Sequence, residues 1–504
     1  MLLIFPPAAK ACEPPPGMAR LHGTLKHHGV PVRSIDMNLE GFYDLYHREV
    51  EAEDLWGKRA VKKREMNLFN LWDAHGYENR DRYKNAVMDI GKVLTMASKP
   101  WGAQVSLANY KSFTLSPLRS HDLLYAAEHP EENVFYPYFS RRFQELITED
   151  PGALDTVGFS MNYLNQALCT FAMIGYLKRL GRPVKIVLGG GLTTSFMRKP
   201  GFLSPFGNLV DLMVAGKGEE PLLKLFGVEP RESACLPDYG EPVPDKPYLS
   251  PGLVLPYCTA DGCYWKKCTF CPEQAEDNPY EPLPVETAVE QVRELDRIYR
   301  PALFHFVDNA LSPRFMAALA RSGFQTPWYT FARVTGQMKD PDFCRSLKQS
   351  GCRMMKLGIE SGDQNVLDHL SKGIDLQTVS ETLVQLHRAG IATYVYLLFG
   401  TPWETEETAR KTMDFVRDHK DLISYMNIAL FNLPYFAKAW DNLETSEFYD
   451  GDLSLYKEFN HPLGWNRSNI RNFLAREFKK HPDISAIINR DPPVFNSNHA
   501  AFFS

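Results

Sequence analysis

Residues 253–271 read LVLPYCTADGCYWKKCTFC, in which a short apolar run leads directly into four closely spaced cysteines. The apolar run is typical of a buried strand in a parallel sheet. Strand-like and helical segments alternate from this point to residue 431. Six strand–helix units of this kind predict a partial or complete β/α barrel, whose chemistry lies at the carboxyl ends of its strands. The cysteines therefore follow the first barrel strand at the end where reactive groups are expected.

The alternation depends on the spacing of apolar residues and on helix end signals. In 284–299 the apolar residues recur at helical spacing behind Pro284, and Ser312–Pro313 predicts the start of another helix. Gly351 is expected to end the helix before it, and Gly390 the helix 376–389. The predicted strands are 253–258, 303–308, 328–333, 353–360, 392–399 and 425–431.

The N-terminal part of the chain predicts a second open parallel sheet of Rossmann-like type. Helices at 17–29 and 166–180 separate its strands, and glycine-rich segments follow the later ones. Ligands of such sheets bind at the carboxyl ends of the strands. The predicted strands are 2–5, 32–37, 156–160, 184–188 and 209–215.

Three further segments complete the predicted organisation. Residues 40–150 are mostly helical, charged and rich in aromatic side chains, and we interpret them as an insertion in the N-terminal domain 1–225. Its aromatic residues fit a packing role better than the lining of a substrate cavity. Residues 226–252 form a proline-rich linker to the barrel, 253–434, and 435–504 form a C-terminal extension without a strong pattern.

Composition limits the function classes. The 504 residues suggest about three domains of roughly 150 residues each, and 44% hydrophobic with 23% charged residues excludes a disordered chain. A net charge of −5 argues against nucleic acid as partner, and no stretch approaches the roughly 18 apolar residues of a membrane span. The N-terminus lacks the basic residues of a secretory signal. Nine cysteines, an odd number, indicate a reducing compartment, so we expect a cytoplasmic protein.

The cysteines Cys263, Cys268 and Cys271 form a C-x4-C-x2-C pattern that suits a metal centre. With Cys258 as a fourth ligand, the three cysteines could hold a zinc ion. With a distant cysteine as the fourth ligand, Cys344 or Cys352, they could hold a two-iron cluster. We favour a 4Fe-4S cluster held by three cysteines, because one open iron for a chelating substrate suits a reactive centre at a strand end.

The segment GCYWKKCTFC at 262–271 resembles the cluster loop of radical S-adenosylmethionine (SAM) enzymes, although their commonest spacing, C-x3-C-x2-C, has one residue fewer. GIESG at 358–362 and FGTPWET at 399–405 extend the resemblance over 250–434. It implies a TIM-type partial (β/α)6 barrel with the three cysteines as cluster ligands. It also implies a set of residues that contact SAM. For two of these residues, Arg333 and Glu360, a structural ion pair with each other is the alternative. The implied SAM-binding residues are Phe270, Arg333, Gly358, Glu360, Ser361 and Gly400.

Asp308 and Asn309 end the second predicted barrel strand. They could contact substrate or SAM, or cap the helix that begins near Ser312.

The N-terminal sheet resembles the cobalamin-binding domain that often precedes this barrel. The resemblance rests on the proline-rich first loop, Asp36 and Asn38, VGFS at 157–160, LGGG at 188–191 and AGKGEE at 215–220. The first loop lacks the histidine of a D-x-H-x-x-G motif, which implies histidine-off binding; a Rossmann-like domain that binds nothing is the alternative. His22, His27 and His28 are expected to be exposed or packed. The implied cobalamin-binding residues are Pro16, Gly17, Ser160, Gly189, Gly190, Gly191, Thr193, Gly216, Gly218 and Glu219.

Together the resemblances imply a cobalamin-dependent radical SAM enzyme that acts on an unreactive carbon. We favour methyl transfer, with ring contraction or another rearrangement as the alternative outcomes. The resemblances also imply a 4Fe-4S cluster, SAM and cobalamin as cofactors, and an external electron donor of flavodoxin or ferredoxin type. A small molecule or peptide is the expected substrate. A methylthiotransferase-like tRNA modification enzyme and a non-enzymatic corrinoid or redox sensor with a structural cluster are the alternatives.

Overall fold

The computed structural model describes residues 1–231, 234–241 and 246–504, so Pro242 and Pro244 of the predicted linker lie outside the described residues. The chain divides into two compact units. The first holds residues 1–252 with the short segments 449–455 and 493–495, and the second holds the remainder.

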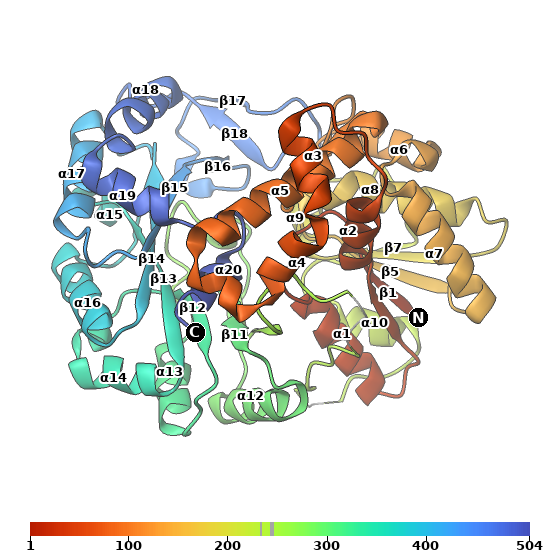
Figure 1. Cartoon of the computed structure of the whole chain (residues 1–504), viewed down its shortest axis with the longest axis horizontal. Helices are drawn as coiled ribbons and strands as arrows, with labels where there is room; N and C mark the ends of the chain where they lie inside the picture. Colours follow the sequence, from red (N-terminus) through yellow and green to blue (C-terminus); the bar gives the residue numbers. More distant parts are fainter. Residues whose placement is uncertain (232–233, 242–245) are drawn as a thin grey trace. The chain divides into compact units, whose positions relative to one another are not determined.

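A parallel five-stranded sheet in the order β2-β1-β5-β6-β7 forms the centre of the first unit (Figure 1). The buried strand β1 pairs with β2 on one side and with β5 on the other. The direction in which strands are added therefore reverses between β1 and β5, and the crevice outside the carboxyl ends at such a reversal is the usual ligand site of doubly wound sheets. The predicted Rossmann-like sheet is confirmed. Its strands are β1 (Leu2–Phe5), β2 (Arg33–Asp36), β5 (Thr156–Ser160), β6 (Lys185–Gly189) and β7 (Leu212–Met213).

Helices on both faces bury this sheet. The helix α1 begins at Pro16, as proline favours the first helical turn, and ends just before Gly29, whose φ of +75° the absence of a side chain permits. Apolar residues of α1 and α10 share one core cluster with β1 and β6. These helices are α1 (Pro16–His27), α8 (Leu164–Lys178), α9 (Gly191–Arg198) and α10 (Glu219–Leu225).

The helical insertion between β2 and β5 begins earlier than predicted. Asp36 caps helix α2 through the backbone amide of Leu39, so Asn38 lies in the first helical turn and not in a loop. A two-stranded hairpin, β3 (Ala103–Val105) and β4 (Tyr110–Ser112), was not predicted because its strands are very short. The helices are α2 (Met37–His47), α3 (Leu55–Lys62), α4 (Arg64–Trp72), α5 (Arg80–Ser98), α6 (Ser120–Glu128) and α7 (Tyr136–Glu149).

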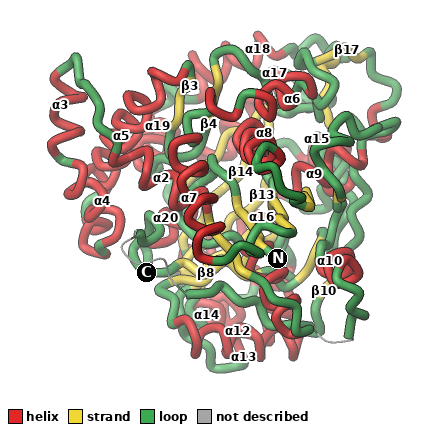
Figure 2. The backbone as a smooth tube through the Cα atoms, turned by 90° about the vertical axis from the view of Figure 1, so that its right-hand side faces the viewer, coloured by secondary structure: helices red, strands yellow, loops and turns green. Residues whose placement is uncertain are grey.

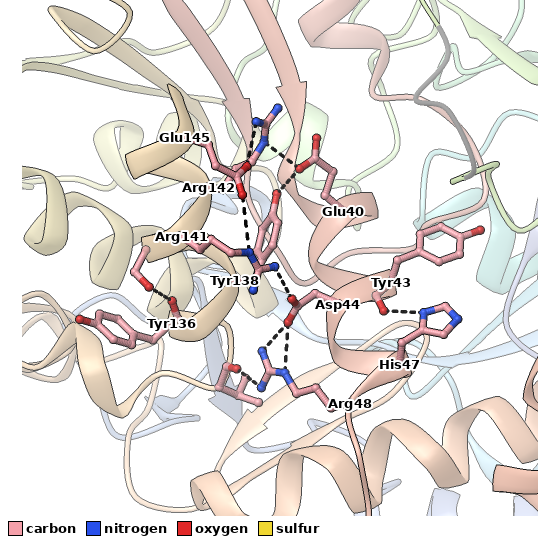
Figure 3. Close-up of polar contacts among 12 residues, drawn as sticks. Glu40, Tyr43, Asp44, His47, Arg48, Tyr136, Tyr138, Arg141, Arg142 and Glu145 are labelled. Atoms are coloured by element: carbon pink, nitrogen blue, oxygen red, sulfur yellow. Dashed lines mark hydrogen bonds and ion pairs between the residues drawn. The ribbon is translucent and has the colours of Figure 1, made fainter. Parts of the chain in front are cut away.

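Charged and hydroxyl groups join α2 to α7 within this insertion (Figure 3). The buried carboxylate of Glu40 accepts hydrogen bonds from the Tyr138 hydroxyl at 2.8 Å and from Arg142 Nε at 3.1 Å. One turn further along α2, Asp44 accepts a hydrogen bond from Arg141 at 2.7 Å. Because Glu40 is buried, its cation is needed to offset the loss of hydration, and the network holds the two helices together.

The second unit is built on six parallel strands in the order β15-β14-β13-β12-β11-β8, which confirms the predicted partial barrel. Sequential neighbours pair throughout, as expected when each strand is followed by a helix that returns over the outer face. The strands are β8 (Val254–Tyr257), β11 (Leu303–Phe306), β12 (Trp328–Ala332), β13 (Cys352–Glu360), β14 (Ala392–Phe399) and β15 (Tyr425–Leu430).

The barrel helices lie side by side outside these strands, and Figures 1 and 2 show α12, α13 and α14 next to one another at one edge of the unit. Pro284, Ser312, Gly351 and Gly390 mark helix ends as predicted. These helices are α12 (Val285–Tyr299), α13 (Pro313–Arg321), α14 (Pro341–Gln349), α15 (Gln364–His369), α16 (Leu376–Arg388) and α17 (Glu406–Asp418).

The C-terminal extension has more structure than its sequence suggested. Ala500, from the last helix, packs in one cluster with Val254, Leu303 and Tyr425, which stand near the amino ends of their strands. The last helix thus covers the end of the barrel opposite the cysteines. Its elements are β16 (Leu433–Pro434), β17 (Thr445–Glu447), β18 (Tyr456–Phe459), α18 (Arg467–Phe473), α19 (Pro482–Arg490) and α20 (Asn496–Ala501).

None of the helices in the described part of the chain combines the length and the apolar character needed to cross a bilayer.

Candidate functional site

The cysteine loop runs from the end of β8 to the short helix α11 (Pro272–Ala275) at the carboxyl end of the barrel. Cys263, Cys268 and Cys271 are free thiols and partly exposed. The Cys258 thiol donates a hydrogen bond to the Ala260 carbonyl at 2.8 Å. Within the described residues, no group of three or more Cys, His, Asp or Glu side chains is arranged around a single ion. A 4Fe-4S cluster makes no such demand, because each thiolate binds a different iron.

Burial disfavours the ionisation of two of these thiols, Cys268 and Cys271. Burial raises the pKa of Cys271 to about 11, although the backbone amides of Glu273 and Gln274 act in the opposite direction. Burial also raises the pKa of Cys268, against the nearby charges of Lys372 and Arg333. Iron supplies the missing positive charge when it binds, since a coordinating thiol is deprotonated. Three accessible thiols on one loop at a strand end therefore fit a three-cysteine cluster.

Asp308 and Asn309 form hydrogen bonds with the first residues of the cysteine loop. The buried Asp308 carboxylate accepts hydrogen bonds from the Thr259 amide at 3.0 Å and from the Thr259 hydroxyl at 2.6 Å. Asn309 Nδ2 donates to the Gly262 carbonyl at 3.3 Å. Burial raises the pKa of Asp308 to about 6. Helix α13 is capped by Ser312 without a side-chain hydrogen bond, so neither residue serves as its cap.

Lys372, which sequence reasoning missed, is the ion-pair partner of Glu360. Its Nζ lies 2.7 Å from Glu360 Oε1, and both side chains are buried. The predicted alternative of an Arg333–Glu360 pair is therefore not what the structure shows. A Cβ on Gly358 would stand 2.5 Å from Glu360 Oε1 and 2.8 Å from Lys372 Nζ, so a larger residue there would displace the ends of these two side chains. No motif marks Lys372, because the turn after α15 brings it to the site.

The other residues predicted to contact SAM form hydrogen bonds or packing contacts within the protein. The fully buried Ser361 hydroxyl lies 3.2 Å from the Thr412 hydroxyl of α17 and accepts a hydrogen bond from the Asp363 amide. Phe270 packs against a cluster that includes Trp440. The Gly400 amide donates to Glu404 Oε2, at a φ of +83°. Ser361 and Gly400 thus stabilise the loops at the barrel mouth through hydrogen bonds to neighbouring residues.

Glu404 is a second residue that the sequence did not single out. Its Oε2 also accepts a hydrogen bond from Trp465 Nε1 of the C-terminal extension at 3.0 Å, while its Oε1 is buried without a hydrogen-bond partner. Burial raises the pKa of Glu404 to about 8, against the hydrogen bonds from Gly400 and Trp465. The carboxyl group is therefore mostly protonated at neutral pH.

In the first unit, the predicted cobalamin-binding residues gather at the carboxyl ends of the strands. Gly190 has a φ of +103°, and a Cβ there would stand 2.5 Å from the Met161 carbonyl oxygen. The buried Thr193 hydroxyl donates back to the Gly189 carbonyl, and the Gly191 amide donates to Asn162 Oδ1.

The remaining predicted residues lie along the same edge. Pro16 and Gly17 open α1, whereas Ser160 ends β5 and its hydroxyl accepts a hydrogen bond from Asn162 Nδ2. Gly218 precedes α10, whose first residue, Glu219, forms an ion pair with Arg20. The Gly216 amide donates to Thr194 Oγ1.

The fit of this edge to a large planar ligand rests on close backbone approach and on one open donor. The buried Nδ2 of Asn38 has no hydrogen-bond partner among the residues that the structure describes, whereas its Oδ1 accepts from the Ala9 amide at 2.7 Å. A ligand rich in amide groups offers acceptors for such a donor. The helix α1 histidines serve the protein instead: His22 contacts Ser34, and His28 Nδ1 lies 2.8 Å from the Thr24 carbonyl.

Comparison with known proteins adds family information to this geometry. Residues 257–416 match the model of the radical SAM superfamily. Bacteriochlorophyllide d C-12(1)-methyltransferase of Chlorobaculum tepidum is 22% identical over 380 residues, which is 70% of this chain and 80% of that protein. Tryptophan 2-C-methyltransferase of Streptomyces laurentii is 33% identical over 106 residues, 20% of this chain and 18% of its own.

One solved structure extends the likeness to both units at the level of the fold. The radical S-adenosylmethionine methyltransferase TsrM from Kitasatospora setae, with tryptophan substrate and a SAM analogue bound, has a TM-score of 0.58 at 15% identity. The match covers 97% of this chain and 89% of TsrM. With the cysteine loop at the carboxyl end of six parallel strands, the match over residues 257–416 places the radical SAM superfamily model on the barrel of this chain.

Proposed function

We propose that this protein is a cobalamin-dependent radical SAM enzyme that transfers a methyl group to an unreactive carbon of a small molecule or peptide. The observation that carries the proposal is the pairing, within one chain, of three accessible thiols after the first barrel strand with a parallel sheet whose carboxyl edge is lined by glycines. The methyltransferase names of the two relatives support the same reaction class.

In this proposal, Cys263, Cys268 and Cys271 hold the cluster, and the mouth of the barrel binds SAM. When bound, the cofactors supply low-potential electrons, the methyl group and its carrier. The Glu360 carboxylate and the Lys372 ammonium group offer one charge of each sign to the amino and carboxylate groups of SAM. Phe270 and the backbone at Gly358 are the other proposed SAM contacts, while Ser361 and Gly400 would hold the surrounding loops in position.

We further assign cobalamin to the carboxyl edge of the five-stranded sheet, in the histidine-off mode. Gly189, Gly190 and Gly191 allow the backbone to approach the ligand closely, and the Asn38 amide group provides a donor. Pro16, Gly17, Ser160, Thr193, Gly216, Gly218 and Glu219 are the other proposed contacts.

The wider assignments follow from these two. Residues 1–225 would form the cobalamin domain, 226–252 the linker, 253–434 the radical SAM domain and 435–504 a supporting extension. We place the protein in the cytoplasm, because an odd number of cysteines, nine, indicates a reducing compartment, and we expect a flavodoxin or ferredoxin as electron donor.

The test is anaerobic purification and cluster reconstitution, followed by incubation with reductant and SAM, with and without cobalamin. We expect a 4Fe-4S spectrum, cobalamin that stays with the protein on gel filtration, and cobalamin-dependent formation of S-adenosylhomocysteine. Tryptophan, the substrate bound to TsrM, is the first candidate acceptor to test by mass spectrometry. Retained cobalamin without any SAM turnover would instead support a sensor, and absence of the cluster would contradict the proposal.

A pair of cysteine variants tests the ligand set. Cys268→Ala should abolish the cluster spectrum, whereas Cys258→Ala should keep it, because the Cys258 thiol donates to the Ala260 carbonyl. The opposite result would restore a four-thiolate site.

A further inference from the structure

The turn that follows α15 is fastened to the cysteine loop by its own backbone. The carbonyl of Leu370 accepts a hydrogen bond from the Thr269 amide at 3.1 Å, and the carbonyl of Ser371 accepts one from Trp265 Nε1 at 3.0 Å. The Trp265 ring also packs directly over Gly373, where a Cβ would overlap the ring and where φ is +65°. The turn and the loop therefore have one relative position, which the indole ring defines.

Arg333, at the end of β12, is held between these two segments. Its NH2 group donates to the carbonyl of Lys372 at 2.5 Å and lies 3.4 Å from that of Gly373. The guanidinium carbon lies 4.1 Å from the centre of the Trp265 ring, at the distance of a cation–π contact. Its NH1 group is directed at Cys268 Sγ, 3.8 Å away. Three contacts thus aim one donor of a buried cation at a proposed cluster ligand.

The charge of Arg333 is not cancelled locally. No carboxylate in the described ranges forms an ion pair with it, whereas the neighbouring Lys372 is paired with Glu360. The other cation on the ring, Lys267, lies 4.9 Å from the Trp265 centroid and is exposed to solvent. Arg333 is therefore the buried, uncompensated cation nearest the Cys268 sulfur.

We infer that Arg333 is a positioning residue for electron transfer. By donating an N–H···S hydrogen bond to the Cys268 thiolate, Arg333 raises the reduction potential of the cluster. The inference rests on the proposed function, because it presumes the cluster. When the cluster takes up one electron from a low-potential donor, the added negative charge spreads onto the ligand sulfurs. A fixed cation and a hydrogen-bond donor beside one sulfur stabilise the reduced form more than the oxidised form. Trp265 and the 370–373 turn keep the donor in place.

The test is an EPR-monitored redox titration of the reconstituted cluster without SAM, with iron content measured in parallel. Arg333→Met keeps the length of the side chain and removes the charge and the donors. We expect the ratio of reduced to oxidised cluster at a fixed applied potential to fall about tenfold, which is about 59 mV for a one-electron couple. Lys267→Met removes one positive charge from the same loop and should leave the ratio near that of the wild type.

Two further variants keep the inference falsifiable if Arg333→Met loses its cluster. Arg333→Lys keeps the charge but loses the planar fork, so the ratio should fall less than in Arg333→Met. Trp265→Phe keeps a ring under the guanidinium group but loses the bond to Ser371, and should shift the ratio in the same direction. Wild-type potentials in both variants would overturn the inference.

The outcomes separate this inference from the proposed function. An arginine that served only SAM would leave the potential of the SAM-free cluster unchanged, which would overturn the inference while SAM turnover by the wild type still supported the enzyme. A wild-type protein that assembles no 4Fe-4S cluster would overturn both. A rise in the potential of Arg333→Met would also contradict the inference, because the sign is set by the positive charge.

Discussion

Replacing Glu404 by Gln should change how the stability of the protein depends on pH. The Glu404 side chain is 1% exposed, and its Oε2 accepts hydrogen bonds from the Gly400 amide and from Trp465 Nε1. Burial raises its pKa to about 8, from an ordinary value of 4.5. Glutamine reproduces the protonated form: its oxygen can accept both hydrogen bonds, and its amide group takes the position of the unpartnered Oε1.

The magnitude follows from proton linkage. The folded protein holds the proton on Glu404 up to about pH 8, whereas the unfolded chain releases it above about pH 4.5. The contribution of this group to stability is therefore fully present below pH 4.5 and is lost as the pH rises towards 8, by at most ~1.4 kcal/mol per pH unit. Between pH 5 and pH 8 the wild type should lose about 4 kcal/mol relative to Glu404→Gln, which cannot ionise.

The assay is a pair of thermal unfolding curves recorded across this pH range. At roughly 2 °C per kcal/mol for a unit of this size, the Tm of Glu404→Gln minus that of the wild type should rise by up to about 8 °C from pH 5 to pH 8. Glu407→Gln, at an exposed position in the first turn of α17, is the matched control and should show no such trend. A difference that does not change with pH would refute the reasoning, because it would mean that Glu404 ionises normally in the folded protein.

Three other substitutions test separate parts of the structure. Gly373→Ala should lower the iron content after reconstitution, because its Cβ would overlap Trp265, whereas Gly336→Ala meets nothing within 4 Å and should keep the wild-type content. Arg142→Met should lower the Tm by several degrees, because it leaves the buried Glu40 without its cation at a cost of about 3 kcal/mol in stability. Arg141→Met, at a more exposed arginine paired with Asp44, should lower the Tm less, and equal losses of Tm would contradict the reasoning. Gly190→Ala should reduce cobalamin retention on gel filtration by about tenfold or more, since the new Cβ would meet the Met161 carbonyl. Gly201→Ala, whose Cβ would meet no atom within 4 Å, is the control, and equal retention in the two variants would count against the proposed ligand edge.

Much of the fold was predictable because parallel strands carry a strong local signal. Buried strands such as β1 read as continuous apolar runs, and many of the neighbouring helices end at glycine or begin at proline. The extension gave no such signal. Strands as short as β16 and β17 have too few residues to show alternation, and they form only because β18 pairs with both.

The site divides in the same way. The spacing of Cys263, Cys268 and Cys271 identified the loop, because one chain segment supplies all three thiols. Lys372 and Trp465 could not be found in this manner. Each becomes relevant only through a contact with a residue distant in sequence, Glu360 in one case and Glu404 in the other.

By itself, then, the amino-acid sequence determined the two parallel sheets and the cysteine loop, since these depend on local periodicity and on a short motif. Only the tertiary structure decided which charges surround that loop. Arg333 was expected to contact SAM or to pair with Glu360. The fold pairs Glu360 with Lys372 and directs one of the Arg333 donors at Cys268. The reason is physical: the direction of a long side chain is set by the ring and the carbonyls that pack around it, and residues 265 and 370–373 contact Arg333 only in the folded unit.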